Sequence, residues 1–575
     1  MRMIPKLIAA WAAFGLSACA TAPVSEAQSK PPVAAAREDA FVIAANPLAA
    51  QAGQEVLKRG GSAVDAAIAV QAMLSLVEPQ SSGVGGGAFI NYYDARSRKV
   101  SIYDGREVAP ARATSTMFLG EDGKPLPFNV AVLSGRATGV PGALAALKLA
   151  HSEHGRLQWS TLFETPRRTA ADGFIVSPRL ARLLRGDFAE NRAPDVIAYF
   201  SQGPGGSLVD ARDRLKNPAY AQFLQRLADQ GISAFYTGST AARIVERTRQ
   251  GPLPGSMTSA DLAGYEPIKR EGLCRTVRVY VMCVPPPPSS GVGLIQLMKL
   301  LEQTDVAQRG PNDPQAWYLF AEASRIMYAD RDRYVGDVPT VPVDGLLDPA
   351  YVASRAKLIG PTAGPPPPPG TPPGAQVAAA DGTLEPTGTS HFIVRDAQGN
   401  VVSMTTTVES IFGSGRMVDG FFLNNQMTDF AFKPVDDQGR PAVNAVAPGK
   451  RPRSSMTPVI LMTPDGRFAG AIGSAGGNAI LAYVAKSLVA AIDWGLPMQE
   501  AIAKPNLVAR GPNFMGEVTK FSPEVLNGLR ERGVELKPGQ GEDSGVHGVL
   551  IRDGRVDGGF DPRREGVVLT LPKQP

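Results

Sequence analysis

The stretch Gly388-Thr389-Ser390-His391-Phe392-Ile393-Val394-Arg395-Asp396 lies deep inside a chain of 575 residues. A threonine follows a glycine there and opens a segment that we expect to be a strand. If the Gly388–Thr389 bond breaks, Thr389 becomes a new N-terminus that carries a hydroxyl nucleophile and an α-amine. Because such an amine has a pKa of about 7.7–8.0, it can act as the base for its own hydroxyl. A glycine-threonine pair before a strand is common, so the rest of the chain has to support this hypothesis.

The composition changes just before this pair. Residues 360–388 are rich in proline, glycine and alanine and include five consecutive prolines from Pro365. This composition disfavours both helix and strand, so it predicts an extended, flexible linker. Flexibility there would let the severed end move away from the new N-terminus.

The residue pattern predicts strands after Thr389 and helices before it. Downstream, two hairpins are expected, at 391–396 with 400–407 and at 459–462 with 468–472, followed by a helix over 478–492. Upstream, helices are expected at 47–57 and 63–76, then a strand after the glycine turn at 83–87, and mainly helix over 140–360. Strands flanked by helices on both sides predict a layered α/β sandwich.

The composition excludes several classes of function. Hydrophobic residues make up 43% and charged residues 20%, with a net charge of +5, as in an ordinary globular protein with a sizeable core. The chain contains no dense run of Lys and Arg interleaved with aromatic residues, which argues against nucleic-acid binding. The glycine cluster at 83–87 lacks the Lys-Ser/Thr of a phosphate-binding loop. His151 and His154 lie three apart on an expected helix without a third ligand nearby, so we predict no metal site and no cofactor.

The N-terminus has the pattern of an export signal. A basic start at 1–6 precedes a short apolar run at 7–16, which is too short to be a convincing membrane span. Leu16-Ser17-Ala18-Cys19 resembles a bacterial lipobox, which implies cleavage before Cys19 and acylation of that cysteine. We therefore expect a signal peptide at 1–18, a tether at 19–38 and a periplasmic, lipid-anchored protein. The alternative is a simple secretory signal.

The expected export bears on whether the two remaining cysteines are oxidised. Cys274 and Cys283 flank a strand-like run at 275–281. In an oxidising compartment they are expected to form a disulfide, and the alternative is two separate buried thiols.

Several segments in one order along the chain resemble the γ-glutamyltranspeptidases, members of the N-terminal nucleophile hydrolase superfamily. The resemblance runs from about residue 40 to 570 and implies a four-layer αββα sandwich. It also implies that the chain cuts itself into two subunits that remain associated, a large one at 39–388 and a small catalytic one at 389–575. The matching segments are 47–69, 78–87, 104–110, 139–142, 286–291, 328–337, Thr389-Ser390-His391, 423–430, 451–458 and Gly473-Ser474-Ala475-Gly476-Gly477.

The resemblance assigns catalytic roles. It implies a cut between Gly388 and Thr389, with Thr389 as the nucleophile and Thr407 as its hydrogen-bond partner. The backbone N–H groups of Gly476 and Gly477 would form the oxyanion hole, where one such donor can lower a barrier by about 3 kcal/mol. His391 lies near the nucleophile, but a structural role is favoured over base catalysis.

The resemblance also assigns substrate contacts. Arg106, with Ser454 and Ser455, would bind the α-carboxylate, since guanidinium is a planar fork that fits a carboxylate. Gln426 and Asp429 would hold the α-ammonium.

Three features depart from the family pattern. Position 390 is serine where threonine is common, which is a mild change. Glu409 stands where many relatives carry asparagine, and it would repel the carboxylate, help to hold the ammonium, or face solvent. The segment 431–449, where relatives carry a lid loop, contains no tyrosine or tryptophan, which argues against an aromatic gate.

The leading hypothesis is a γ-glutamyl hydrolase and transferase that acts on amides such as glutathione, with water, an amino acid or a peptide as acceptor. The first alternative is a glutaryl or cephalosporin-type acylase of the same superfamily. The second is an exported lipoprotein without catalysis. The acceptor, the balance of hydrolysis and transfer, and the oligomeric state beyond the two subunits stay open.

Overall fold

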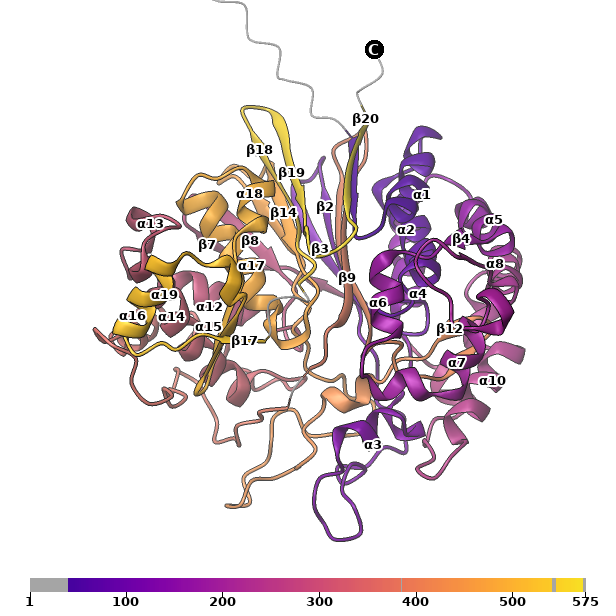
Figure 1. Ribbon diagram of the computed structural model, residues 1–575, viewed down its shortest axis with the longest axis horizontal. Helices are drawn as coiled ribbons and strands as arrows, with labels where there is room; N and C mark the ends of the chain where they lie inside the picture. The colour runs from indigo at the N-terminus through magenta and orange to yellow at the C-terminus, as the bar shows by residue number, and fades with distance from the viewer. Residues whose placement is uncertain (1–39, 384, 540–543, 572–575) are drawn as a thin grey trace, which may run out of the picture.

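The computed structural model describes residues 40–383, 385–539 and 544–571. The predicted signal peptide, Cys19 and the tether at 19–38 lie outside this part of the chain. Two large sheets pack face to face between two helical layers, which confirms the expected αββα sandwich (Figure 1). Within the described residues, no helix combines the length and apolar character needed to cross a membrane.

The first sheet has seven strands and holds the Gly388–Thr389 pair near its centre. Strand β9 (Gly388–Arg395) pairs with β10 (Val401–Glu409) in the predicted hairpin, and every residue of both strands is buried. In order, the sheet contains β20 (Val567–Leu571), β1 (Ala40–Ala44), β9, β10, β2 (Gly87–Asp94), β3 (Lys99–Gly105) and β6 (Ile268–Glu271).

The second sheet has six strands and includes the other predicted hairpin. Its order is β19 (Arg555–Phe560), β18 (His547–Arg552), β14 (Phe468–Gly473), β13 (Val459–Met462), β8 (Tyr280–Val284) and β7 (Leu273–Val277). The two sheets bury apolar side chains between them, among them Ile393, Ile460 and Val549. Burying such side chains is the main favourable contribution to folding.

Helices cover the outer face of each sheet. Those on the first sheet include α1 (Pro47–Lys58), α2 (Ala63–Val77), α4 (Ala143–His154), α5 (Glu164–Asp172) and α8 (Pro218–Gln230). Those on the second include α12 (Gly291–Glu302), α14 (Pro314–Tyr334), α17 (Ile480–Leu488) and α19 (Pro523–Glu531). Further helices are α3 (Phe128–Val132), α6 (Pro178–Leu184), α7 (Pro194–Phe200), α10 (Gly238–Arg249), α16 (Pro349–Ala356) and α18 (Met498–Ala503).

Side-chain caps fix where the first two helices begin. The Asn46 side chain accepts from the backbone N–H of Leu48 and is followed by Pro47 at the first helical position of α1. Ser62 and Asp65 form a capping box at the start of α2. The predicted helices at 47–57 and 63–76 are therefore confirmed.

The strand-like run at 275–281 proves to be a hairpin, so the single-strand prediction is wrong. Arg278 adopts a left-handed backbone conformation with φ of 54°, which separates β7 from β8. Its guanidinium contacts Asp493 at 2.9 and 2.8 Å. Cys274 and Cys283 thus lie opposite each other and form the predicted disulfide.

The segment before the predicted cut contains no helix or strand between α16 and β9 in its described part, as its composition predicts. It is not wholly exposed, since Ala379, Asp381 and Glu385 are buried. Its flexibility and the division into two subunits stay predictions.

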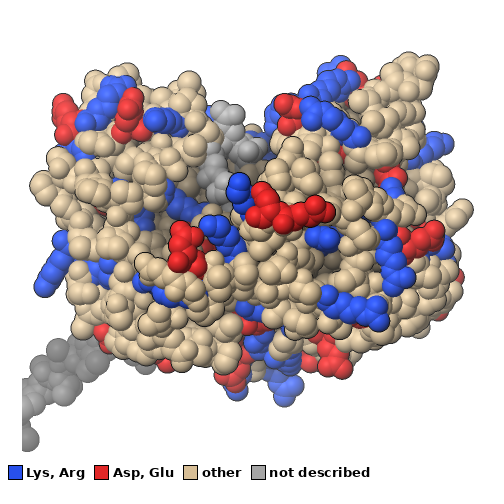
Figure 2. Space-filling view, turned by 90° about the horizontal axis from the view of Figure 1, so that it is seen from below, with Lys and Arg blue, Asp and Glu red and all other residues tan. Residues whose placement is uncertain are grey.

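Charges of both signs are interspersed on the face seen from below (Figure 2). This mixture accords with the small net charge of +5.

Candidate active site

Thr389 and Thr407 face each other across the β9–β10 hairpin. The Thr389 hydroxyl donates to Thr407 Oγ1 at 3.1 Å, and the Thr407 hydroxyl donates to the carbonyl oxygen of Gly388 at 2.5 Å. Both threonines are buried. Hydroxyl groups therefore form a continuous chain from the predicted nucleophile to the carbonyl that it would attack.

Glu409, which has a strained backbone conformation, donates a backbone hydrogen bond to Thr407. Glu409 has φ of 83°, a conformation that costs a residue other than glycine about 1–3 kcal/mol. The strand register shifts between Thr407 and Glu409, where Glu409 lies opposite Gly388. This shift directs the Glu409 N–H onto Thr407 Oγ1 at 2.8 Å.

Two residues far away in the sequence, Arg564 and Glu78, form hydrogen bonds with the start of β9. The sequence pattern does not predict these contacts. Arg564 donates through Nη1 to the carbonyl oxygen of Thr389 at 2.7 Å. Ser390 donates to Glu78 Oε2 at 3.0 Å. The Glu78 carboxylate also lies 3.7 Å from Arg564, so the two contacts share one ion pair.

Gly476 and Gly477 lie between β14 and α17, with φ of 131° and 53°. Both angles favour glycine. A Cβ on Gly477 would lie 2.1 Å from the carbonyl oxygen of Pro386, so the predicted oxyanion loop packs directly on the chain just before the predicted cut.

Arg106, Glu409, Gln426 and Asp429 form one buried cluster. Arg106 Nη2 donates to Asp429 Oδ2 at 2.6 Å. Gln426 Nε2 donates to Asp429 Oδ2 at 2.7 Å and also to Glu409 Oε2. Because Glu409 is only 4% exposed, the interpretation that it faces solvent is wrong.

Four polar atoms of this cluster have no hydrogen-bond partner among the described residues. One is a donor, Arg106 Nη1, and three are acceptors, Glu409 Oε1, Gln426 Oε1 and Asp429 Oδ1. Buried polar atoms are rarely left in this state in folded proteins. The set therefore indicates a site for a ligand that offers an acceptor to the arginine and several donors to the acids and the amide.

The cluster holds more acid than base. Glu107, which borders the four-residue cluster and which sequence reasoning did not single out, lies 3.6 Å from Arg106 and is fully buried. Both of its carboxylate oxygens also have no hydrogen-bond partner among the described residues. Burial raises the pKa of Glu107 to about 8 and that of Asp429 to about 6, and Arg106 opposes both shifts. Burial, and then the neighbouring Asp429, raise the pKa of Glu409 well above its usual value. Three carboxyl groups thus surround one guanidinium, and a ligand cation would favour their ionised forms.

Ser454 and Ser455, the serines predicted to bind the α-carboxylate, lie in a loop beside this cluster, but their hydroxyl groups form hydrogen bonds with other residues. Arg106 binds the backbone of their loop, through the carbonyl oxygens of Pro452 at 3.1 Å and Arg453 at 2.6 Å. Ser454 Oγ accepts from the N–H of Met456, and Ser455 Oγ accepts from Arg331 at 2.7 Å. Neither hydroxyl forms a hydrogen bond with Arg106.

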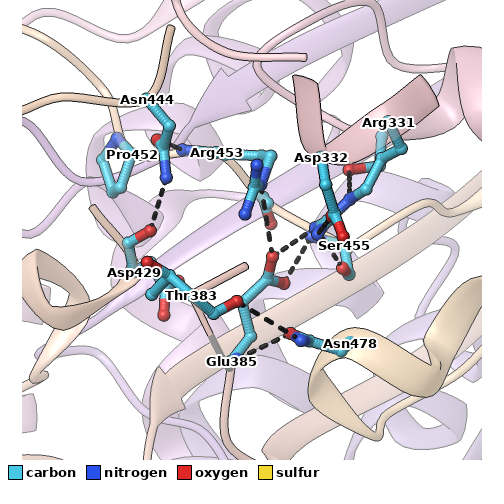
Figure 3. Close-up of polar contacts among 12 residues, drawn as sticks. Arg331, Asp332, Thr383, Glu385, Asp429, Asn444, Pro452, Arg453, Ser455 and Asn478 are labelled. Carbon is cyan, nitrogen blue, oxygen red and sulfur yellow. Dashed lines mark hydrogen bonds and ion pairs between the residues drawn. The ribbon is translucent and has the colours of Figure 1, made fainter. Parts of the chain in front are cut away.

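Ser455 belongs instead to a second buried network, which the sequence did not reveal (Figure 3). The network centres on the carboxylate of Glu385, four residues before Thr389, which pairs with Arg331 and lies 3.8 Å from Arg453. Arg453 also pairs with Asp381 at 3.1 Å.

The histidines hold structural positions. His391 Nδ1 lies 2.9 Å from Thr405 Oγ1, and burial lowers its pKa well below the usual value. His151 contacts the carbonyl of Leu157, and His154 stacks on Tyr92. Across the described residues, no three His, Cys, Asp or Glu side chains gather as a metal site requires.

These features define a class of enzyme. A threonine lies at the start of a central strand in one of two packed sheets, a glycine precedes it, and a hydroxyl faces it across the hairpin, as in an N-terminal nucleophile hydrolase. More narrowly, the chain belongs to the γ-glutamyltranspeptidase family, whose model matches residues 49–571.

Relatives cover nearly the full chain. The glutathione hydrolase proenzyme of Bacillus subtilis is 34% identical over 93% of this chain and 92% of its own length. The acylase ACY 1 proenzyme of a Pseudomonas species is 32% identical over 92% and 93%. A cephalosporin acylase structure from Bacillus halodurans superposes with a TM-score of 0.80 at 26% identity, covering 92% of this chain and 95% of that one.

Proposed function

We propose that the protein cuts itself between Gly388 and Thr389 and then uses Thr389 to cleave γ-glutamyl amides such as glutathione. The product would be a heterodimer of the two subunits. An amino acid, a peptide or water would accept the γ-glutamyl group.

In self-cleavage, the Thr389 hydroxyl attacks the carbonyl carbon of Gly388. The chain of hydroxyls supports this step, because it directs the proton of the attacking group through Thr407 toward the oxygen that gains charge. The Gly388–Thr389 C–N bond then breaks, the nitrogen takes a proton and becomes the α-amine, and Gly388 remains as an ester on Thr389. Water hydrolyses that ester to a Gly388 carboxylate and restores the hydroxyl.

In turnover, the new α-amine takes the proton of the Thr389 hydroxyl as the oxygen attacks the γ-carbonyl carbon of the donor. The amine of the leaving group departs with a proton and leaves a γ-glutamyl ester on Thr389. Attack by water gives glutamate, and attack by an amine gives a new γ-glutamyl amide. The N–H groups of Gly476 and Gly477 would stabilise the oxyanion in both halves of the reaction.

The single observation that carries the substrate assignment is the set of atoms without partners in the cluster of Arg106, Glu409, Gln426 and Asp429. One guanidinium donor matches an α-carboxylate, and three acceptors match the three N–H bonds of an α-ammonium. We therefore assign Glu409 to the ammonium rather than to repulsion of the carboxylate.

A glutaryl acylase is the second candidate, because the chain also resembles two proteins named as acylases. A glutaryl group has no ammonium, so it would leave three buried acceptors without donors and three carboxyl groups with only the Arg106 guanidinium to compensate them. This cost favours the γ-glutamyl donor. The non-catalytic lipoprotein is disfavoured because Thr389, Thr407 and both glycines are present.

Export to the periplasm and anchoring through an acylated Cys19 are part of the proposal and rest on the N-terminal pattern alone.

The test compares release of nitroaniline from γ-glutamyl and glutaryl p-nitroanilides by the same preparation, with Thr389→Ala as the blank. We expect a higher kcat/KM for the γ-glutamyl compound. A clear preference for the glutaryl compound would overturn the assignment.

A further inference from the structure

One buried carboxylate anchors the chain just before the cut. Glu385 Oε2 accepts from the backbone N–H of Ser455 at 2.9 Å, and Oε1 accepts from Arg331 Nη2. Arg453 Nε lies 3.8 Å from Oε1 (Figure 3). The residue is only 5% exposed, so these charged contacts form out of water.

The pocket around this carboxylate is held by other residues. Arg331 is fully buried and donates to Ser290 Oγ at 3.0 Å, to Ser455 Oγ at 2.7 Å and to Asp332 at 3.1 Å. Arg453 is held by its ion pair with Asp381. The guanidinium groups are thus oriented by partners other than Glu385, which makes the pocket a preformed site for a carboxylate.

The backbone of Glu385 is fixed as well. Its N–H donates to Asn478 Oδ1 at 2.6 Å, and the Asn478 N–H donates back to the Glu385 carbonyl at 3.4 Å. Asn478 directly follows Gly477, whose missing side chain makes room for the carbonyls of Glu385 and Pro386. The anchored residue therefore lies against the loop that would stabilise the oxyanion.

Only Pro386 and Thr387 separate this anchor from Gly388. Proline fixes its own φ and restricts the residue before it to extended conformations. Little conformational freedom thus remains between the fixed carboxylate and the scissile carbonyl. Holding reacting groups in an attack geometry is a large source of rate in intramolecular reactions.

We propose that Glu385 is a positioning residue for self-cleavage. Its carboxylate, bound to Arg331 and to the Ser455 N–H, fixes the backbone before Gly388 and so holds the Gly388 carbonyl carbon in position for attack by the Thr389 hydroxyl. The proposal rests on the self-cleavage proposed above. It adds a role for a residue that lies outside the threonine and glycine motifs.

The test follows the conversion of freshly translated precursor into two chains on denaturing gels. Glu385→Gln keeps the shape of the side chain but loses its charge, and we expect cleavage to slow by roughly 30-fold, because hydrogen bonds to charged groups are the strong ones. Glu385→Asp keeps the charge with a shorter reach, and we expect it to recover part of the lost rate. The matched control is Asp493→Asn, which removes the carboxylate of the Arg278 ion pair away from the cut, and we expect the wild-type rate.

Folding is checked separately by thermal unfolding of each variant in the uncleavable Thr389→Ala background. The proposal is overturned if folded Glu385→Gln cleaves within twofold of wild type, or if Glu385→Asp is as slow as Glu385→Gln. If Glu385→Gln does not fold, Arg331→Lys decides: slower cleavage supports the anchor, and the wild-type rate refutes it. A wild-type chain that stays uncut would instead refute the proposed function, which keeps the two failures distinguishable.

Discussion

Asp429→Asn tests the ammonium site by removing one charge without changing the shape of the side chain. A unit charge about 4 Å from an ammonium contributes about 4 kcal/mol at an effective dielectric constant of 20. Glu409 and Gln426 would still accept from the ammonium, so we expect a loss of about 3 kcal/mol, or roughly 100-fold in kcat/KM for a γ-glutamyl donor. A glutaryl donor carries no ammonium, and its kcat/KM should fall by less than about fivefold.

The assay measures both p-nitroanilides at pH 8, where Asp429, with its pKa raised to about 6, is ionised. Asp436→Asn serves as the control, because that carboxylate contacts Arg440 outside the cluster. An equal loss for both donors would refute the reasoning, since Asp429 would then act only by holding Arg106. The wild-type KM for the γ-glutamyl donor should also rise as the pH falls below about 6, because protonated Asp429 no longer attracts the ammonium.

Three further predictions concern other parts of the molecule. Thr407→Val removes the donor to the Gly388 carbonyl, so self-cleavage should slow by roughly 100-fold on denaturing gels; Thr407→Ser should restore most of the rate, and equal rates for Val and Ser would contradict the role. Burial lowers the pKa of His547 to about 4 from an unfolded value near 6.5, so the unfolded chain binds the proton first as the pH falls. The free energy of unfolding of the Thr389→Ala chain should therefore drop by about 3 kcal/mol from this residue between pH 6.5 and pH 4, and an unchanged pH dependence of the urea midpoint after His547→Gln would refute this. Replacing Cys274 and Cys283 together by alanine should cost about 2–3 kcal/mol of stability in urea titrations, and no loss would show that the disulfide does not constrain the unfolded chain.

The parts of the site that sequence predicts well depend on short-range pattern. The turn at 397–400 sets the register of the β9–β10 hairpin, and this register alone brings Thr389 opposite Thr407. The same local logic located the hairpin of β13 and β14 and the first two helices. Hairpin and capping signals act within a few residues, so they are legible in a single sequence.

The parts that sequence did not predict depend on partners far along the chain. Arg564 reaches Thr389 across 175 positions, and Ser390 reaches Glu78 across 312. The sequence pattern predicts strand at Arg278, because the left-handed conformation found there is rare for arginine and the residue that contacts it, Asp493, lies 215 positions away. The buried contacts of Glu385 could not be predicted, because the composition of its segment indicates only an extended linker.

The most direct test of the account is the intact mass of purified protein, combined with N-terminal sequencing of its chains. We expect two chains for the wild type, the smaller beginning Thr389-Ser390-His391, and one uncut chain without activity for Thr389→Ala. A wild-type preparation that remains a single uncut chain and still releases nitroaniline from the γ-glutamyl donor would contradict the account, because no free α-amine would then exist at Thr389.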